Sequence, residues 1–80
     1  MKARVQVGLK PGVLDPEGQA IAHALTDLGF AEVTEARKSK VIELALTETD
    51  PARAKDRVEA MCERLLANPV IESYRIEIED

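Results

Sequence analysis

Few side chains in this sequence could do covalent or acid–base chemistry. It contains one cysteine, Cys62, and one histidine, His23. A cysteine nucleophile needs a neighbouring base, but the surrounding apolar spacing places these two residues in different helices. Cys62 falls on an apolar stripe, where a free cysteine is usually packed in a core. We expect a buried thiol at Cys62 and an exposed imidazole at His23, with a pH-dependent partner contact as the alternative for His23.

The carboxylates and glycines also lack a recognisable catalytic grouping. Glu59 and Glu63 are one helical turn apart, which is typical of a solvated helix flank. One cysteine excludes an intrachain disulfide and any cysteine-built metal or iron–sulfur site within one chain. Gly12 and Gly18 are not followed by the Lys-Ser or Lys-Thr of a phosphate loop. We therefore expect a chain without catalytic residues that binds no cofactor and no metal.

Composition indicates one small globular domain spanning residues 1–80. The chain is 45% hydrophobic with a net charge of −4, and its charges of both signs are interspersed, which argues against nucleic acid or an anionic membrane as partner. A domain of this size buries only about 60% of its unfolded surface, so association would supply missing burial. No apolar stretch resembles a signal peptide or a membrane span, and a reducing cytoplasm is expected.

The first half of the chain predicts a strand, a capped helix and a second strand. Residues Lys2 to Lys10 alternate apolar and polar, and Pro11-Gly12 should end that strand. Asp15 and Pro16 occupy the N-cap and first positions of a helix expected to run to Leu28. Gly18 lies on its apolar face, which would let the first turn approach the sheet or a neighbouring chain closely.

The second half predicts a hairpin, another helix and a final strand. Residues Phe30 to Lys38 form a weaker strand, joined through a tight turn at Lys38-Ser39 to a strand over Lys40 to Thr47, with the basic run Arg37 to Lys40 as a solvated hairpin tip. A helix from Asp50-Pro51 to about Ala67, with Leu65 on its apolar stripe, should end at Asn68 in a left-handed cap. Residues Val70 to Glu79 alternate again. The expected fold is a two-layer α+β domain of order β-α-β-β-α-β, with a mainly antiparallel four-stranded sheet and two helices on one face.

Two stretches closely resemble the PurS subunit of phosphoribosylformylglycinamidine synthase. They are Lys10 to Gly18 and Met61 to Tyr74, with Leu28-Gly29-Phe30 as a further match. Ser39 departs from the glycine expected before Lys40, which puts the turn type of the hairpin in doubt. The resemblance covers essentially the whole chain and implies a small non-catalytic subunit of de novo purine biosynthesis.

The resemblance also implies partners. A synthetase subunit (PurL) uses ATP and Mg to activate formylglycinamide ribonucleotide, and a glutaminase subunit (PurQ) releases ammonia. The small subunit forms a homo-dimer or tetramer and bridges the two, which helps ammonia transfer. Physical candidates for the interface are two rigid corners, one at each of these stretches, made of Lys10, Val13, Leu14, Asp15, Gly18, Asn68, Pro69 and Val70. Leu14 is alternatively a hydrophobic staple that packs on the first helical turn.

Two other function classes fit the element order. One is a dimeric regulatory domain that senses a small molecule beside the first strand-to-helix loop. The other is an enzyme of the acylphosphatase type, which needs an anion-holding arginine in that loop, and none lies between Lys10 and Gly18. The bridging subunit is therefore the leading hypothesis, the sensor is second and the enzyme is last.

Overall fold

A three-stranded antiparallel sheet forms the body of the molecule. The computed structural model describes residues 1–79, and in it β1 (Lys2–Leu9) lies between β2 (Lys40–Ala45) and β3 (Glu72–Glu79). Arg4 of β1 is paired with Glu43 on one side and Glu77 on the other, an opposite-charge pairing on the solvated face. The three strands alternate as their sequences predict, so one face of the sheet is apolar.

One helix covers that apolar face. The helix α2 (Pro51–Met61) begins at the N-cap Asp50, whose side chain accepts a hydrogen bond from the amide of Ala52. The core is built from small and β-branched residues of the central strand and from α2, and its fully buried members are Ala3, Val5, Val7, Ala54, Val58 and Cys62. The expectation that the Cys62 thiol is packed in the core is confirmed.

The end of this helix widens into a π turn, η1 (Cys62–Leu66). The amide of Ala67 donates to the carbonyl of Cys62 at 3.0 Å, five residues back. The wider turn rotates the following side chains, so that Ala67 is buried while Leu65 is 84% exposed. Leu65 was expected on the apolar stripe of a regular helix, and that expectation is wrong.

Asn68 ends the helix without a left-handed conformation. No described residue other than glycine has a positive φ, because Pro69 favours extended backbone in the residue before it. Asn68 closes the corner by hydrogen bonds instead. Its side-chain oxygen accepts from the amide of Val70 at 3.0 Å, and its carbonyl accepts from the amide of Glu72 at 2.7 Å.

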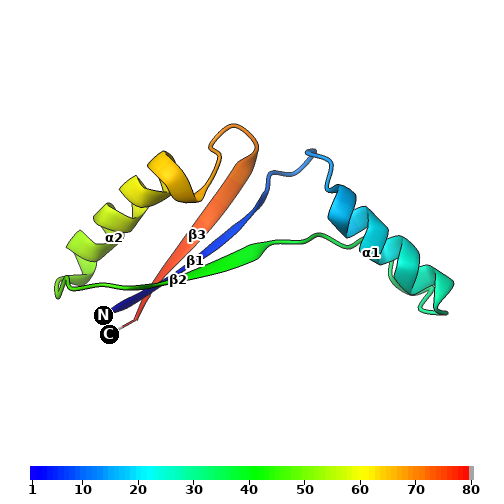
Figure 1. The fold of residues 1–80 in the computed structure, drawn as a ribbon, viewed down its shortest axis with the longest axis horizontal. Helices are drawn as coiled ribbons and strands as arrows, with labels where there is room; N and C mark the ends of the chain where they lie inside the picture. The colour runs from blue at the N-terminus through cyan, green and yellow to red at the C-terminus, as the bar shows by residue number, and fades with distance from the viewer. Residues whose placement is uncertain (80) are drawn as a thin grey trace.

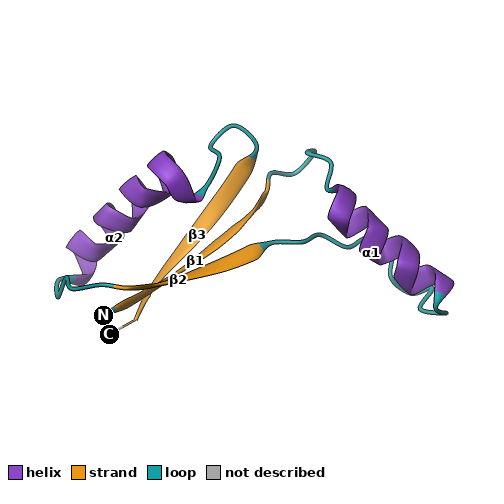
Figure 2. Ribbon diagram, in the orientation of Figure 1, coloured by secondary structure: helices purple, strands orange, loops and turns teal. Residues whose placement is uncertain are grey.

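The first helix begins where the sequence predicts but lies elsewhere in space. The helix α1 (Pro16–Asp27) is capped by Asp15 and followed by Gly29 at a φ of +100°. It projects away from the sheet, far from α2 (Figures 1 and 2). The radius of gyration is 16.0 Å, against roughly 12 Å for a compact chain of this length. The two helices therefore do not share one face of the sheet, contrary to expectation.

The expected strand over residues 30–38 does not form. Residues 30–33 make a turn, in which the amide of Val33 donates to the carbonyl of Phe30 at 3.2 Å, and the chain then returns along α1 into β2 with no hairpin at Lys38-Ser39 (Figure 1). A two-residue hairpin of the favoured kind needs positive φ at its central positions, which neither lysine nor serine adopts readily. The described part of the chain thus has two helices and a three-stranded sheet, and the basic run is not a hairpin tip.

Candidate functional site

The two predicted corners meet at one end of the sheet. The Lys10 ammonium donates to the carbonyl of Pro69 at 2.7 Å, and the Lys10 amide donates to the carbonyl of Ile71 at 2.8 Å. The loop after β1 and the turn before β3 lie at the same end of the molecule (Figure 1). Residues far apart in the sequence therefore form one continuous surface, which we call the corner surface: Lys10–Leu14 and Asn68–Ile71.

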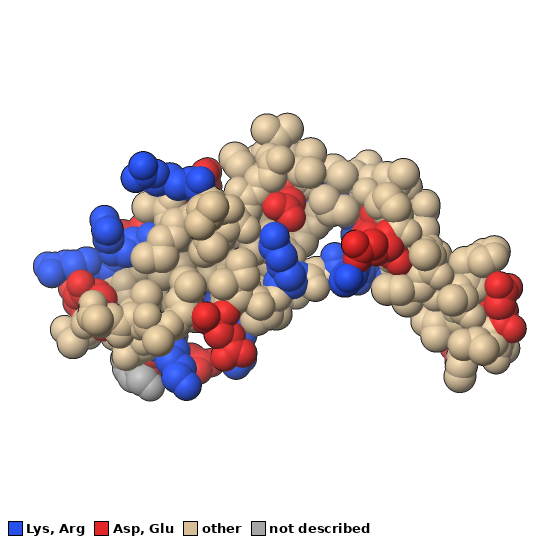
Figure 3. All heavy atoms as spheres, in the orientation of Figure 1, with Lys and Arg blue, Asp and Glu red and all other residues tan. Residues whose placement is uncertain are grey.

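Apolar side chains are exposed on the corner surface. Leu14 is 63% exposed and Val70 is 80% exposed. The staple interpretation of Leu14 is wrong, because an exposed side chain does not pack on the first helical turn. In Figure 3 the tip of the turn before β3 is uncharged, whereas charges of both signs are scattered over α2. Exposed apolar groups on short, hydrogen-bonded turns suit docking to another protein, since little entropy is lost on binding.

Asp15 joins the corner surface to the base of the first helix. One carboxylate oxygen accepts from the amide of Gly18 at 2.9 Å, and the other accepts from the amide of Lys38 at 2.7 Å. These two hydrogen bonds, from Lys38 first and then Gly18, lower the pKa of the Asp15 carboxyl below its ordinary value, and the nearby Arg37 guanidinium acts in the same direction. Asp15 is buried, so its charge is held by backbone amides in place of water.

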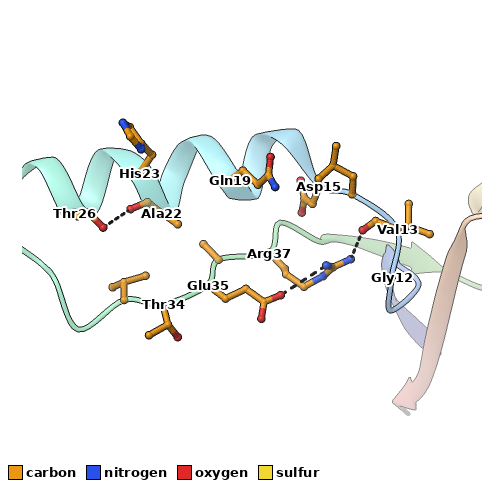
Figure 4. Close-up of a pocket in the computed structure, with 13 residues that line it drawn as sticks. Gly12, Val13, Asp15, Gln19, Ala22, His23, Thr26, Thr34, Glu35 and Arg37 are labelled. Atoms are coloured by element: carbon orange, nitrogen blue, oxygen red, sulfur yellow. Dashed lines mark hydrogen bonds and ion pairs between the residues drawn. The ribbon is translucent and has the colours of Figure 1, made fainter.

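Arg37 holds the same loop from the segment that returns along α1; we call α1 and this segment together the arm (residues 16–39). Its guanidinium donates to the carbonyls of Leu9, Lys10 and Val13 at 3.4, 3.3 and 3.1 Å. Arg37 also lies 3.8 Å from the Glu35 carboxylate (Figure 4). The sequence analysis missed this role, because Arg37 was assigned to a solvated hairpin tip. No local spacing signals the contact, since it joins segments that are distant in the chain.

Gly18 allows the helix to lie directly on the returning backbone. A Cβ atom at this position would overlap the carbonyl oxygen of Ala36 and would lie 3.0 Å from the Cα of Arg37. The close approach predicted for Gly18 therefore exists, but its neighbour is the chain's own segment and not the sheet. Together these contacts form what we call the arm joint: Asp15, Gly18, Ala36, Arg37 and Lys38.

A hollow of about 620 Å³ opens between α1 and the returning segment. Gln19, His23 and Thr26 line it from the helix, while Thr34 and Glu35 line it from the opposite side (Figure 4). The Asp15 carboxylate and the Arg37 guanidinium, which also line the hollow, already form hydrogen bonds within the arm joint. Thr26 donates to the carbonyl of Ala22 at 3.0 Å. The His23 side chain is 82% exposed and lies 3.6 Å from Asp27. The hollow thus offers surface but no converging set of catalytic groups.

Two possible reactive groups, Cys62 at the end of α2 and Tyr74 on β3, are also buried or hydrogen-bonded. Burial, followed by the charges of Glu63 and Glu59, raises the pKa of the Cys62 thiol. Tyr74 donates to the Glu63 carboxylate at 2.6 Å, and this hydrogen bond is the main cause that raises the pKa of Tyr74 to about 12. Cys62 and His23 lie in different parts of the molecule. Cys62 is thus an inert core thiol.

The described residues contain neither a metal-binding cluster nor a membrane-spanning helix. No group of three or more His, Cys, Asp or Glu side chains in residues 1–79 is arranged to hold a metal ion. No helix of that part of the chain is long and apolar enough to cross a membrane. What the geometry does present is an α+β module with a rigid corner surface and a projecting helix, the features of an interaction subunit.

Comparison with known proteins identifies the family. The family model "PurS: Phosphoribosylformylglycinamidine (FGAM) synthase" matches residues 2–80. Subunit PurS of this synthase from Bacillus subtilis is 48% identical over 80 residues, covering 99% of this chain and 93% of that protein. The corresponding subunit of Methanocaldococcus jannaschii is 46% identical over 78 residues, covering 98% and 94%. The chain belongs to the PurS family, the subunits of FGAM synthase in purine biosynthesis.

Solved structures of the family have the same fold. PurS of M. jannaschii, described as a subunit of formylglycinamide ribonucleotide amidotransferase, superposes with a TM-score of 0.89 at 47% identity and covers 98% of this chain and 94% of that one. A chain in the structure of PurLQS from Thermotoga maritima superposes with a TM-score of 0.86 at 32% identity, covering 95% and 93%. The resemblance inferred from the two sequence stretches is confirmed.

Proposed function

We propose that this chain is the small non-catalytic subunit that bridges the glutaminase and synthetase subunits of FGAM synthase in the cytoplasm. In this role it aids the transfer of ammonia for the conversion of formylglycinamide ribonucleotide to FGAM on the way to IMP. The observation that carries the proposal is the full-length match to a chain of a PurLQS assembly. ATP and Mg are used by the partner synthetase (PurL), and glutamine by the partner glutaminase (PurQ).

The corner surface supports a docking role. It combines exposed apolar side chains with backbone fixed by hydrogen bonds from Lys10 and Asn68. We assign the candidate interface residues to this surface and to the adjoining arm joint: Lys10, Val13, Leu14, Asp15, Gly18, Asn68, Pro69 and Val70. We further propose that the chain acts as a homo-dimer or tetramer, and that the four-stranded sheet of the expected fold is complete only in that oligomer.

The test compares two amidation reactions. FGAM formation from formylglycinamide ribonucleotide is measured with the matching PurL and PurQ, with and without this chain, using either glutamine or added ammonia. A bridging subunit should be required with glutamine and matter little with ammonia. Equal rates with and without the chain in both reactions would contradict the proposal and would favour the small-molecule sensor.

A further inference from the structure

The loop between β1 and α1, residues Lys10–Leu14, has little structure of its own. Its internal backbone contact is a turn, in which the amide of Val13 donates to the carbonyl of Lys10 at 3.1 Å. Gly12 adopts a φ of +87°, and a Cβ atom placed there would meet nothing within 4 Å. A loop with so few local contacts is mobile unless other parts of the molecule hold it. Half of the corner surface therefore depends on contacts from outside the loop.

Arg37 supplies such contacts from the segment that returns along α1. One nitrogen of its guanidinium, Nη2, lies 3.4, 3.3 and 3.1 Å from the carbonyl oxygens of Leu9, Lys10 and Val13. Three carbonyl dipoles thus converge on one positive charge, which strengthens the hydrogen bonds. The other terminal nitrogen lies 3.8 Å from the Glu35 carboxylate, which helps to orient the guanidinium toward the loop (Figure 4). The loop is therefore wrapped around the Arg37 side chain.

The loop in turn holds the turn before β3. The Lys10 amide donates to the carbonyl of Ile71 at 2.8 Å, and the Lys10 ammonium donates to the carbonyl of Pro69 at 2.7 Å. Because the Lys10 carbonyl also accepts from Arg37, the residue that reaches the turn is itself fixed by the guanidinium. Val70 lies between the two carbonyls that Lys10 binds, and its side chain is 80% exposed. Arg37 and Val70 are thus connected through Lys10.

The arm joint fixes the backbone on both sides of Arg37. On one side the carbonyl of Ala36 lies so close to Gly18 that a Cβ atom there would overlap it. On the other side the Lys38 amide donates to the Asp15 carboxylate at 2.7 Å. The Arg37 side chain is 38% exposed, and its hydrogen bonds go to the backbone of its own chain. Arg37 therefore shapes the corner surface through the loop backbone and not as a contact for a partner.

We propose that Arg37 is the positioning residue of the corner surface. It holds the loop Lys10–Leu14 and, through Lys10, the turn Asn68–Ile71 in the arrangement that the assembled PurL and PurQ subunits bind. Without the guanidinium, the loop carbonyls would turn to water and the turn would lose its fixed neighbour. The surface would then have to be ordered on binding, which lowers affinity. This inference rests on the docking role in the proposed function and adds the residue that prepares the surface for docking.

The first test separates docking from turnover. The wild type, Arg37→Met and Arg37→Lys are each titrated into matching PurL and PurQ with glutamine. The control is Arg53→Met, which removes an exposed arginine that lies 3.9 Å from Glu48. Arg37→Met should need about tenfold more protein to reach half of the maximal rate, with the maximal rate unchanged. Arg37→Lys keeps a cation with several donors and should stay within about threefold of the wild type. Equal titrations of Arg37→Met and Arg53→Met, or a lower maximal rate at an unchanged half-saturation, would overturn the proposal.

The second test uses the chain without its partners. Backbone order parameters from ¹⁵N relaxation should be near 0.85 or so at Gly12 and Val70 in the wild type, and below about 0.6 in Arg37→Met. The order parameter of Val58, which is buried in α2, should be the same in both proteins and shows that the fold is intact. An Arg37→Met protein with an ordered loop and an ordered turn would refute the positioning role.

Lys10→Met keeps the proposal testable where Arg37→Met does not fold. This variant removes the side-chain hydrogen bond to Pro69 but leaves Arg37 in contact with the loop backbone. Order should therefore be lost at Val70 and kept at Gly12, and an ordered Val70 would exclude the link from the loop to the turn. Loss of order in these variants, together with a wild-type chain that has no effect on amidation, would contradict only the bridging function.

Discussion

At the scale of single residues, the arm joint depends on the hydrogen bonds of Asp15 and Arg37 and on the missing side chain of Gly18. Asp15 satisfies two backbone amides at once, and Arg37 satisfies three backbone carbonyls. Gly18 contributes by lacking a side chain. A loop that would otherwise be a flexible linker therefore holds α1 in one direction relative to the sheet.

Gly18→Ala should destabilise the arm, although the same change in an ordinary helix stabilises by roughly 0.5–1 kcal/mol. The added methyl group would overlap the carbonyl oxygen of Ala36, and overpacking against backbone typically costs about 1–3 kcal/mol. Urea denaturation of Gly18→Ala measures the effect. Ala20→Ser, an exposed change on the same turn, is the control. A more stable Gly18→Ala protein would contradict the role assigned to Gly18.

The joint should weaken in acid. Backbone hydrogen bonds from Lys38 and Gly18 lower the pKa of Asp15 from 3.8, so folding favours its ionised form. The stabilisation is fully present above pH 4 or so and is lost as the pH falls through the lowered pKa. Amide hydrogen exchange in α1 between about pH 2 and 6 should show this loss in the wild type, after correction for intrinsic exchange. The Asp15→Asn variant should lack that pH dependence, and equal pH dependence in the two proteins would exclude Asp15 as the titrating group.

At the scale of elements, the π turn decides which side chains α2 buries. It carries Ala67 into the core and turns Leu65 outward, whereas Cys62 is buried by the regular four-residue spacing from Ala54 and Val58. It also places Glu63 within reach of Tyr74, which ties the end of the helix to β3 by a hydrogen bond.

The Cys62 thiol should be unreactive in the folded protein. Its pKa is raised mainly by burial, so little thiolate exists at pH 8 and a reagent cannot reach it. Ellman's reagent should label Cys62 only after denaturant is added. An Ala60→Cys variant, with a second and exposed cysteine, should react at once with one equivalent. Rapid labelling of the native wild type would show that the end of α2 opens readily.

The corner surface should be sensitive to charge. Val70→Asp should leave stability unchanged because the side chain is 80% exposed, yet it should reduce partner affinity by about tenfold if Val70 is buried on docking. Titration of the variant into the PurL and PurQ amidation assay with glutamine gives the affinity. Ala52→Asp on the exposed side of α2 is the matched control. Indistinguishable titrations of the two variants would exclude the turn before β3 as a contact.

At the scale of the whole molecule, stability should depend on protein concentration. If the chain folds as the homo-dimer proposed above, a tenfold rise in concentration should stabilise the dimer by about 1.4 kcal/mol and raise its Tm by about 3–5 °C. Scanning calorimetry or circular dichroism over a roughly hundredfold range of protein concentration measures the change in Tm. A constant Tm would indicate that each copy folds without the other.

The predictions that failed at the scale of the whole molecule concern features that no local pattern in the sequence reports. The alternation in β1, the two Asp-Pro helix starts and the inert chemistry of Cys62 were readable, because period, capping and single-residue inventory are local properties. The exposure of Leu65 could not be read, since a π turn leaves no mark in the apolar spacing. Arg37 and the contact between the two corners involve residues far apart in the chain, and no local pattern reports such contacts.

The sequence by itself determined where the two helices start, the apolar face of the sheet and, through two distinctive stretches, the PurS family. Only the tertiary structure decided that α1 leaves the sheet, that residues 30–39 remain unpaired, and that the two corners form one surface. The physical reason is that a strand or helix can satisfy its apolar face and its backbone edge equally well within its own chain or in a second copy. The direction of α1 follows from the contacts of the arm joint, which connect residues far apart in the chain, and not from the pattern of the elements themselves.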